Sequence, residues 1–187
     1  MLRQHPPSLE EVPAEFEERA AACGTDAWPL LASLGAVIEG AARKARAQPS
    51  VRGVFLEWLD PPYRAGHWTP DLLELAGIED PLGRPGIPSI PGSWAEVAAA
   101  RPELLVLAPC GFDQDRAEKE AALVRSAIES VGAEKGGILD GAAYFNRPGR
   151  PRVDSPEVLG ATRVTEVGGP RETCPLLSIC GPLPCHC

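Results

Sequence analysis

Apolar residues follow a helical period early in the chain and gather in short continuous runs after it. Residues 8–47 are predicted to be helical, and between 27 and 47 apolar side chains recur at spacings of three and four. This stripe predicts a helix of about 18 residues, long enough to cross a lobe at roughly 1.5 Å per residue. Gln48-Pro49 is expected to end it. The stripe consists of Leu30, Leu34, Val37, Ile38, Ala41 and Ala45.

Three apolar runs after the long helix predict buried strands at residues 51–58, 104–108 and near 138–139. A long loop is expected at 59–68 and a Pro/Gly-rich loop at 78–92. Because helices are predicted between the strands, the order is typical of the α/β class, with a short, mostly parallel sheet flanked by helices.

The helices of this region have clear start and stop signals. We expect Thr69 to cap a helix that ends at Gly77, and Ser93 to open a capping box. Asp113 is expected to cap a helix whose apolar stripe continues to residue 131, and Ser155 starts a last short helix. The predicted divisions are an N-terminal segment with the long helix (1–50), a lobe (51–165) and a disordered Cys-rich tail (166–187).

Aromatic residues concentrate where the predicted strands end. In open α/β sheets, ligands bind beyond the carboxyl ends of the strands. Segments 57–63, 108–112 and 141–146 follow strand ends here, and six of the ten aromatic residues lie in or beside them. This favours a broad, flat, partly apolar ligand. The six are Trp58, Tyr63, Trp68, Phe112, Tyr144 and Phe145.

Four runs in the same region resemble a known protein family. They are FLEWLDPP (55–62), AGHWTPDLLELAG (65–77), WAE through PELLVLAPCGFD (94–113) and AYFNRPGRPRVDS (143–155). In this order they resemble the second lobe of cobalamin-binding substrate-binding proteins of ABC uptake systems. The resemblance covers about residues 8–160.

The resemblance implies a fold of two α/β lobes joined by one long helix, with the ligand clamped between them. Residues 27–47 would be the connecting helix and 51–160 the second lobe, so we expect a single lobe of a periplasmic-binding-protein-like fold. The sequence shows no counterpart of the family's first lobe or export signal, and the Cys-rich tail is foreign to the family. Relatives are periplasmic or lipid-anchored, whereas the compartment of this chain stays open.

The leading hypothesis is therefore a binding protein, not an enzyme, that holds cobalamin or a similar metal chelate and delivers it to an ABC permease. A ferric siderophore or haem would suit the same aromatic loops. A degenerate lobe without ligand and an enzyme with a Cys110 nucleophile are further alternatives. No cofactor is expected. The candidate ligand-binding residues are Glu57, Trp58, Asp60, Tyr63, His67, Trp68, Cys110, Phe112, Tyr144, Asn146 and Arg147.

The aromatic and acidic candidates each have a structural alternative. Trp58 and Trp68 either stack on the ligand or fill the core around their loop. Glu57 and Asp60 either bind polar ligand groups or cap the following turn. His67 either lines the cleft or has a plain structural role. Metal ligation is disfavoured, because a single His without further N, S or O ligands makes a poor zinc site.

The remaining candidates are ambiguous too. Cys110 precedes a helix, where a thiol can be activated and pair with a base such as His67; its alternative is a small residue in a tight turn. Asn146 and Arg147 either donate hydrogen bonds to the ligand or only shape a turn.

Charge and composition narrow the partners. The net charge of −8 argues against nucleic acid and against an anionic membrane surface. No apolar stretch approaches the roughly 20 residues of a membrane span, so no insertion is expected. The cysteines of the tail lack the spacing of a zinc site, and no metal site is predicted. They are Cys174, Cys180, Cys185 and Cys187.

Overall fold

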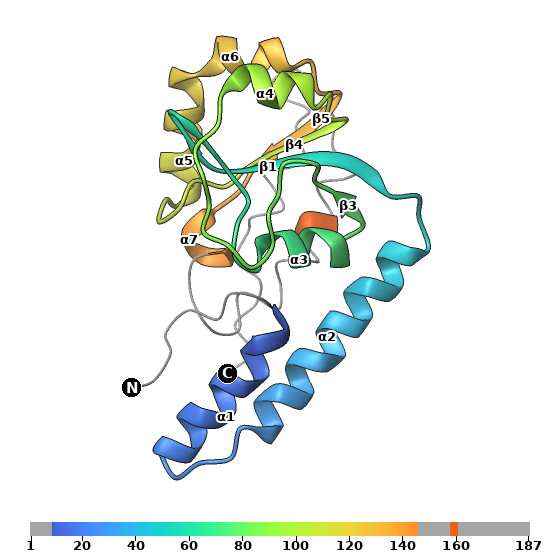
Figure 1. Ribbon diagram of the computed structural model, residues 1–187, viewed down its shortest axis with the longest axis vertical. Helices are drawn as coiled ribbons and strands as arrows, with labels where there is room; N and C mark the ends of the chain where they lie inside the picture. Colours follow the sequence, from blue (N-terminus) through green and yellow to red (C-terminus); the bar gives the residue numbers. More distant parts are fainter. Residues whose placement is uncertain (1–8, 146–157, 161–187) are drawn as a thin grey trace.

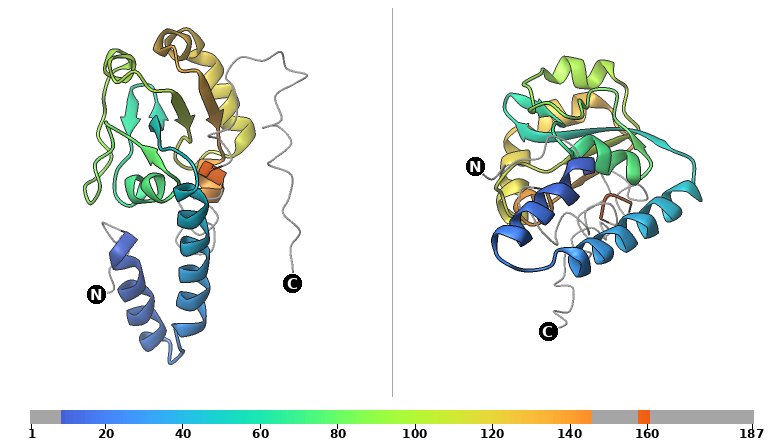
Figure 2. Two further views of the ribbon diagram at one scale, coloured as in Figure 1. Left: turned by 90° about the vertical axis from the view of Figure 1, so that its right-hand side faces the viewer. Right: turned by 60° about the horizontal axis from the view of Figure 1, so that its bottom comes forward.

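The protein folds into an α/β lobe from which a pair of helices projects (Figure 1). The computed structural model describes residues 9–145 and 158–160. A short 3-10 helix, η1 (Leu9–Glu11), leads into α1 (Val12–Ala22), and α2 (Trp28–Arg46) returns beside it to the lobe. Figure 2 shows the two helices side by side, away from the sheet. The predicted long helix is thus confirmed as the 19-residue α2, with a break at 23–27 before it.

The lobe is built on a sheet whose described strands lie in the order β2-β1-β4-β5, with β3 also paired to β1. β1, β3, β4 and β5 are parallel, and β2 forms an antiparallel hairpin with the end of β1. The expected mostly parallel sheet is confirmed. The strands are β1 (Val51–Leu59), β2 (Pro62–Arg64), β3 (Ile78–Glu79), β4 (Leu104–Leu107) and β5 (Lys135–Ile138).

Helices cover both faces of this sheet (Figure 1), which explains why β1 and β4 are continuous apolar runs. Phe55 and Val106 pack on the face of α3 (Thr69–Leu75) and α7 (Gly141–Tyr144). Leu56 and Leu105 pack on the opposite face, which residues of the other three helices complete. Those helices are α4 (Trp94–Ala99), α5 (Gln114–Leu123) and α6 (Arg125–Val131).

The helix ends agree with the sequence in most places. Ser93 and Glu96 form the predicted capping box, and Asp113 accepts the backbone N–H of residue 116 as the cap of α5. Gly77 has φ of 73° just after α3, as expected of a helix end. The cap assigned to Thr69 is wrong, because Trp68 already has helical dihedral angles and no side chain caps α3.

Other differences concern short elements. The single helix predicted up to residue 131 is two helices, α5 and α6, which meet at Val124. The loops predicted at 59–68 and 78–92 contain β2 and β3, and the strand expected near 138–139 lies at Lys135–Ile138. Residues 158–160 are helical, while Ser155 and the tail 166–187 lie outside the described residues. The division at residues 50 and 165 stays a prediction.

Candidate functional site

Hydrogen bonds join the segments that follow β1, β4 and β5 at the carboxyl edge of the sheet. The backbone N–H of Cys110 donates to the carbonyl oxygen of Glu57 at 2.9 Å. On the other side, the N–H of Ala142 donates to the carbonyl oxygen of Phe112 at 3.0 Å. The three segments that the sequence placed at strand ends therefore meet at one edge, where this fold class binds ligands.

Gly141 allows the third segment to come this close. A Cβ atom at this position would overlap the carbonyl oxygen of Pro109 and lie 2.9 Å from that of Ala108. Asp140 caps the helix that starts there, because its Oδ1 accepts the backbone N–H of Ala143 at 2.6 Å. The start of α7 is thus packed directly on the backbone that follows β4.

The exposed aromatic surface of this edge centres on Trp58. Its side chain is 37% exposed, and its ring lies 5.0 Å from the ring of Phe112 at an angle of 59°. The indole Nε1 donates to the carbonyl oxygen of Asp60 at 3.2 Å, which fixes the ring over the turn. Arg116 lies on the Phe112 ring of this pair, with its guanidinium carbon 3.7 Å from the Phe112 centroid. We call Trp58, Phe112 and Arg116 the rim row.

The second tryptophan does not join this row through a ring contact in the described structure. Trp68 is 8% exposed and belongs to the core on the α3 face. The half-buried ring of His67 lies 5.7 Å from it, and the His67 backbone is tied to residues 86 and 87 with φ of 50°. This placement favours the structural alternative for Trp68, and ligand contact by either residue stays a prediction.

The two tyrosines lie on different elements, β2 and α7. Tyr63 is half-buried on β2, directly opposite Trp58 in the strand register. Tyr144 is half-buried on α7, with its ring 6.5 Å from that of Phe145, which is buried against Phe55. Both are placed at the edge that the sequence predicted. Asn146 and Arg147, the remaining candidates, lie outside the described residues.

Glu57 is a buried carboxylate that ties two loops to the end of β1. The residue is 8% exposed, and its Oε1 accepts the backbone N–H of Gly66 at 3.0 Å. Its Oε2 accepts the hydroxyl of Ser89 and lies 3.9 Å from the sulfur of Cys110. The carboxylate thus holds together the loops that support the rim, and Cys110 is exposed beside it.

Asp80, which directly follows β3, plays a similar part nearer the middle of β1. One of its oxygens accepts the N–H of Phe55 at 3.1 Å, and the other accepts the N–H groups of Leu82 and Gly83 at 2.8 and 3.0 Å. Burial raises the pKa of Asp80 above its usual value, although these hydrogen bonds and Arg84 act in the opposite direction. Asp80 therefore closes the part of the β1 edge that lies between β2 and β3.

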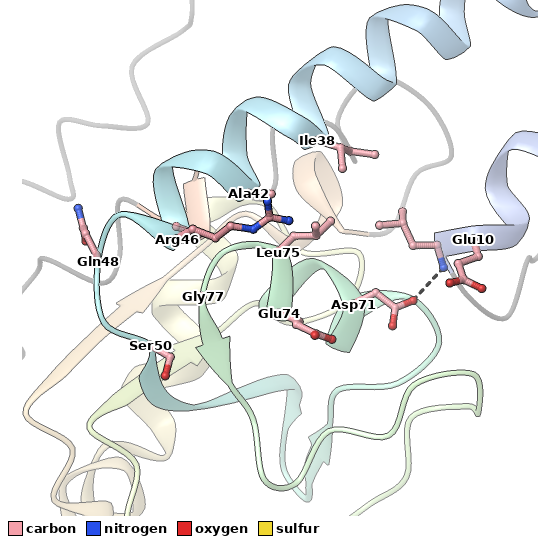
Figure 3. A pocket seen from close by; sticks show the side chains of 12 residues that line it. Glu10, Ile38, Ala42, Arg46, Gln48, Ser50, Asp71, Glu74, Leu75 and Gly77 are labelled. Atoms are coloured by element: carbon pink, nitrogen blue, oxygen red, sulfur yellow. Dashed lines mark hydrogen bonds between the residues drawn. The ribbon is translucent and has the colours of Figure 1, made fainter.

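A separate groove of about 870 Å³ lies between α2, η1 and α3 (Figure 3). Arg46 and Leu75 line it, and Asp71 accepts the backbone N–H of Leu9 at 2.9 Å across its end. Ser50, which precedes β1, also lines it. The groove is therefore at the amino end of β1, away from the rim row, and we do not assign the ligand to it.

Sequence reasoning missed two residues of the carboxyl edge. Arg116 was given no role, although it follows Phe112 by four positions at the start of a predicted helix, the spacing at which side chains meet. Ser89 carries no local signal, because its partner Glu57 is 32 residues away. No group of three metal-capable side chains occurs among the described residues. Within the same residues, no helix combines the length and apolar character that crossing a membrane requires.

No protein-family model matches the chain, and no curated protein matches its sequence. Solved structures do resemble it. An ABC transporter substrate-binding protein from Listeria monocytogenes EGD-e is 12% identical with a TM-score of 0.71, over 84% of this chain and 65% of that one. IsdE of S. aureus, complexed with haem, is 14% identical with a TM-score of 0.69, over the same shares.

The periplasmic vitamin B12-binding protein BtuF of Vibrio cholerae is 14% identical with a TM-score of 0.63, over 84% of this chain and 62% of that one. The chain thus spans less than two thirds of the length of these substrate-binding proteins. Its parallel sheet, flanking helices and long α2 have the fold of a single lobe of a periplasmic-binding-protein-like structure.

Proposed function

We propose that this chain is a substrate-binding component of an ABC-type uptake system and binds cobalamin or a similar metal chelate at the carboxyl edge of its sheet. The observation that carries the proposal is the exposed Trp58 ring, packed on Phe112 where three strand ends meet. An ABC permease would be its partner, as the resemblance to substrate-binding proteins of this class suggests.

The chemistry of the edge supports a flat ligand. Trp58 presents an apolar ring surface, and its contact with Phe112 orients that surface. Tyr63 lies opposite it in the strand register, with a hydroxyl group that can hydrogen-bond to amide or carboxylate groups of a ligand. A macrocycle with an apolar face and polar substituents would use both kinds of group.

Two observations keep the ligand class wider than cobalamin. Solved structures similar to this chain include the haem complex of IsdE and a protein named for Fe3+-hydroxamate transport from Saccharomonospora viridis. A haem or ferric siderophore is therefore the second candidate ligand. The similar structures are named as binding and transport proteins, which favours binding over catalysis by Cys110.

Titration with three ligands tests the proposal. Cyanocobalamin, haem and a ferric hydroxamate are each added to the purified protein, and binding is followed by calorimetry and by shifts of the visible bands. We expect Trp58→Ala to weaken the observed binding roughly thirtyfold, because an indole anchor that the ligand covers is worth about 2 kcal/mol at an interface. The proposal would be refuted if the wild-type protein bound none of the three ligands.

Trp28→Ala is the matched control for the tryptophan. Trp28 is 71% exposed at the start of α2, at the end of that helix which projects from the lobe (Figure 1). The control removes an exposed indole of the same size from a place far from the rim row, so we expect unchanged affinity. An equal loss in both variants would show that Trp58 is not the contact surface.

A further inference from the structure

We infer that Arg116 makes the carboxyl edge selective for chelates that carry carboxylate groups; this inference rests on the proposed function. The rim row places a guanidinium on Phe112, the ring against which Trp58 packs. Its carbon is 3.7 Å from the Phe112 centroid, and Phe112 is 5.0 Å from Trp58. A ligand lying on Trp58 would thus meet a cation at one end of the same row.

The position of Arg116 is set by the start of α5. The Oδ1 atom of Asp113 accepts the backbone N–H of Arg116 at 2.9 Å, which fixes the first turn of the helix. Residue 116 then lies one turn from Phe112, and the side chain reaches back over the aromatic ring. The cation is therefore held in place by packing and by the helix cap together.

The contact with the ring leaves the guanidinium able to bind an anion. A cation–π contact requires no hydrogen-bond acceptor, so the planar N–H donors can still pair with a carboxylate in bidentate fashion. Arg116 forms no ion pair with residues 9–145 or 158–160; within these ranges the ion pair is between Arg19 and Glu15. Arg116 is also exposed, so a ligand can reach it.

The negative charge of the protein makes the Arg116 cation important for binding an anionic ligand. The net charge of −8 repels anionic ligands at long range, and Asp60 and Asp113 are exposed at the same edge. An anionic chelate therefore needs a local cation that a neutral chelate does not. Arg116 supplies that cation on Phe112, the ring next to Trp58.

The test compares two ligands that share one ring system. Ferric protoporphyrin carries two carboxylates, and its dimethyl ester carries none, so their affinity ratio isolates the carboxylate contribution. We expect the wild type to prefer the diacid by roughly five- to tenfold, the worth of one exposed charge-assisted contact. Arg116→Gln should weaken diacid binding by more than ester binding, so that this preference is lost, whereas Arg116→Lys should retain part of it.

Arg125→Gln is the control, because it makes the same change of charge at an exposed position at the start of α6. We expect this variant to keep the preference for the diacid. Thermal melting of all variants checks that the fold is intact.

Equal affinity of the wild type for both porphyrins would overturn the inference, and so would an equal loss for both ligands in Arg116→Gln. Absence of binding to either porphyrin would also overturn it. The proposed function would still stand or fall separately, by the cyanocobalamin and ferric hydroxamate titrations.

Discussion

Glu57 offers the sharpest test of how the loops at the carboxyl edge are held. In the folded protein it accepts the backbone N–H of Gly66 at 3.0 Å and the hydroxyl of Ser89, and it is only 8% exposed. Glu57→Ala removes both acceptors. Glu57→Gln keeps the size of the side chain but replaces one acceptor oxygen with a donor amide group.

The magnitudes follow from the groups left behind. Glu57→Ala leaves the buried N–H of Gly66 without its acceptor, which costs roughly 1–3 kcal/mol, and loses the Ser89 bond, worth about 1 kcal/mol. We therefore expect the free energy of unfolding to fall by about 3 kcal/mol. Glu57→Gln can keep the Gly66 bond while the Ser89 hydroxyl rotates to accept, so we expect a loss of about 1 kcal/mol.

Urea unfolding followed by tryptophan fluorescence measures these losses. Ser89→Ala is the control that removes one partner and leaves the Gly66 bond, and it should cost about 1 kcal/mol. We expect Glu57→Ala to be the most destabilising variant. Glu57→Gln and Ser89→Ala should each cost less, and by similar amounts. If the free energy of unfolding of Glu57→Ala is within about 0.5 kcal/mol of the wild-type value, the carboxylate does not hold the loops. A direct ligand contact then becomes the better explanation of its position.

Three further predictions concern a loop glycine, the buried Asp80 carboxyl and the cap of α4. Gly66→Ala should cost about 3 kcal/mol in urea unfolding, because its Cβ would overlap the backbone nitrogen of Ser89; Gly86→Ala, with open space but φ of 77°, should cost only about 1 kcal/mol. Burial raises the pKa of Asp80, so this carboxyl group binds a proton more tightly in the folded protein than in the unfolded chain. We therefore expect the free energy of unfolding of the wild type, relative to that of Asp80→Asn, to fall as the pH rises from about 4 toward neutrality. A difference that stays flat or rises with pH contradicts this. Ser93→Ala should lower the melting temperature through a loss of about 1 kcal/mol, and a scanning calorimeter would show it.

The sheet could be predicted because its main strands are continuous apolar runs. β1 and β4 are covered on both faces, so their composition alone identifies them. β2 and β3 could not be found in this way. They have three and two residues, too few for any periodicity, and pairing with the long β1 defines them.

The candidate site was predictable in its position and less so in its parts. The topology of a parallel sheet brings segments 57–63, 108–112 and 141–145 to one edge, and this follows from the strand order. The sequence could not separate Trp58 from Trp68. Both lie near the same loop, but one is exposed at the rim and the other is packed in the core, which only the tertiary contacts decide.

Glu57 shows why a polar residue next to an apolar run is difficult to interpret from sequence. Its partners lie 9 and 32 residues away, so no local pattern announces them. A capping residue such as Ser93, in contrast, bonds within three residues of itself and is visible in the sequence. Hydrogen bonds between residues close in sequence are thus predictable, and those between residues far apart in sequence are not.

Ligand choice is a property of the rim and not of the backbone. Proteins named for vitamin B12 and for haem resemble this chain to a similar degree, so backbone similarity does not rank the candidate ligands. The difference has to come from side chains at the carboxyl edge. A neutral chelate would use the exposed ring of Trp58, which the buried Phe112 supports, whereas an anionic chelate would also engage Arg116. The charge of the ligand is therefore the property that binding measurements should vary first, with the ring system held constant.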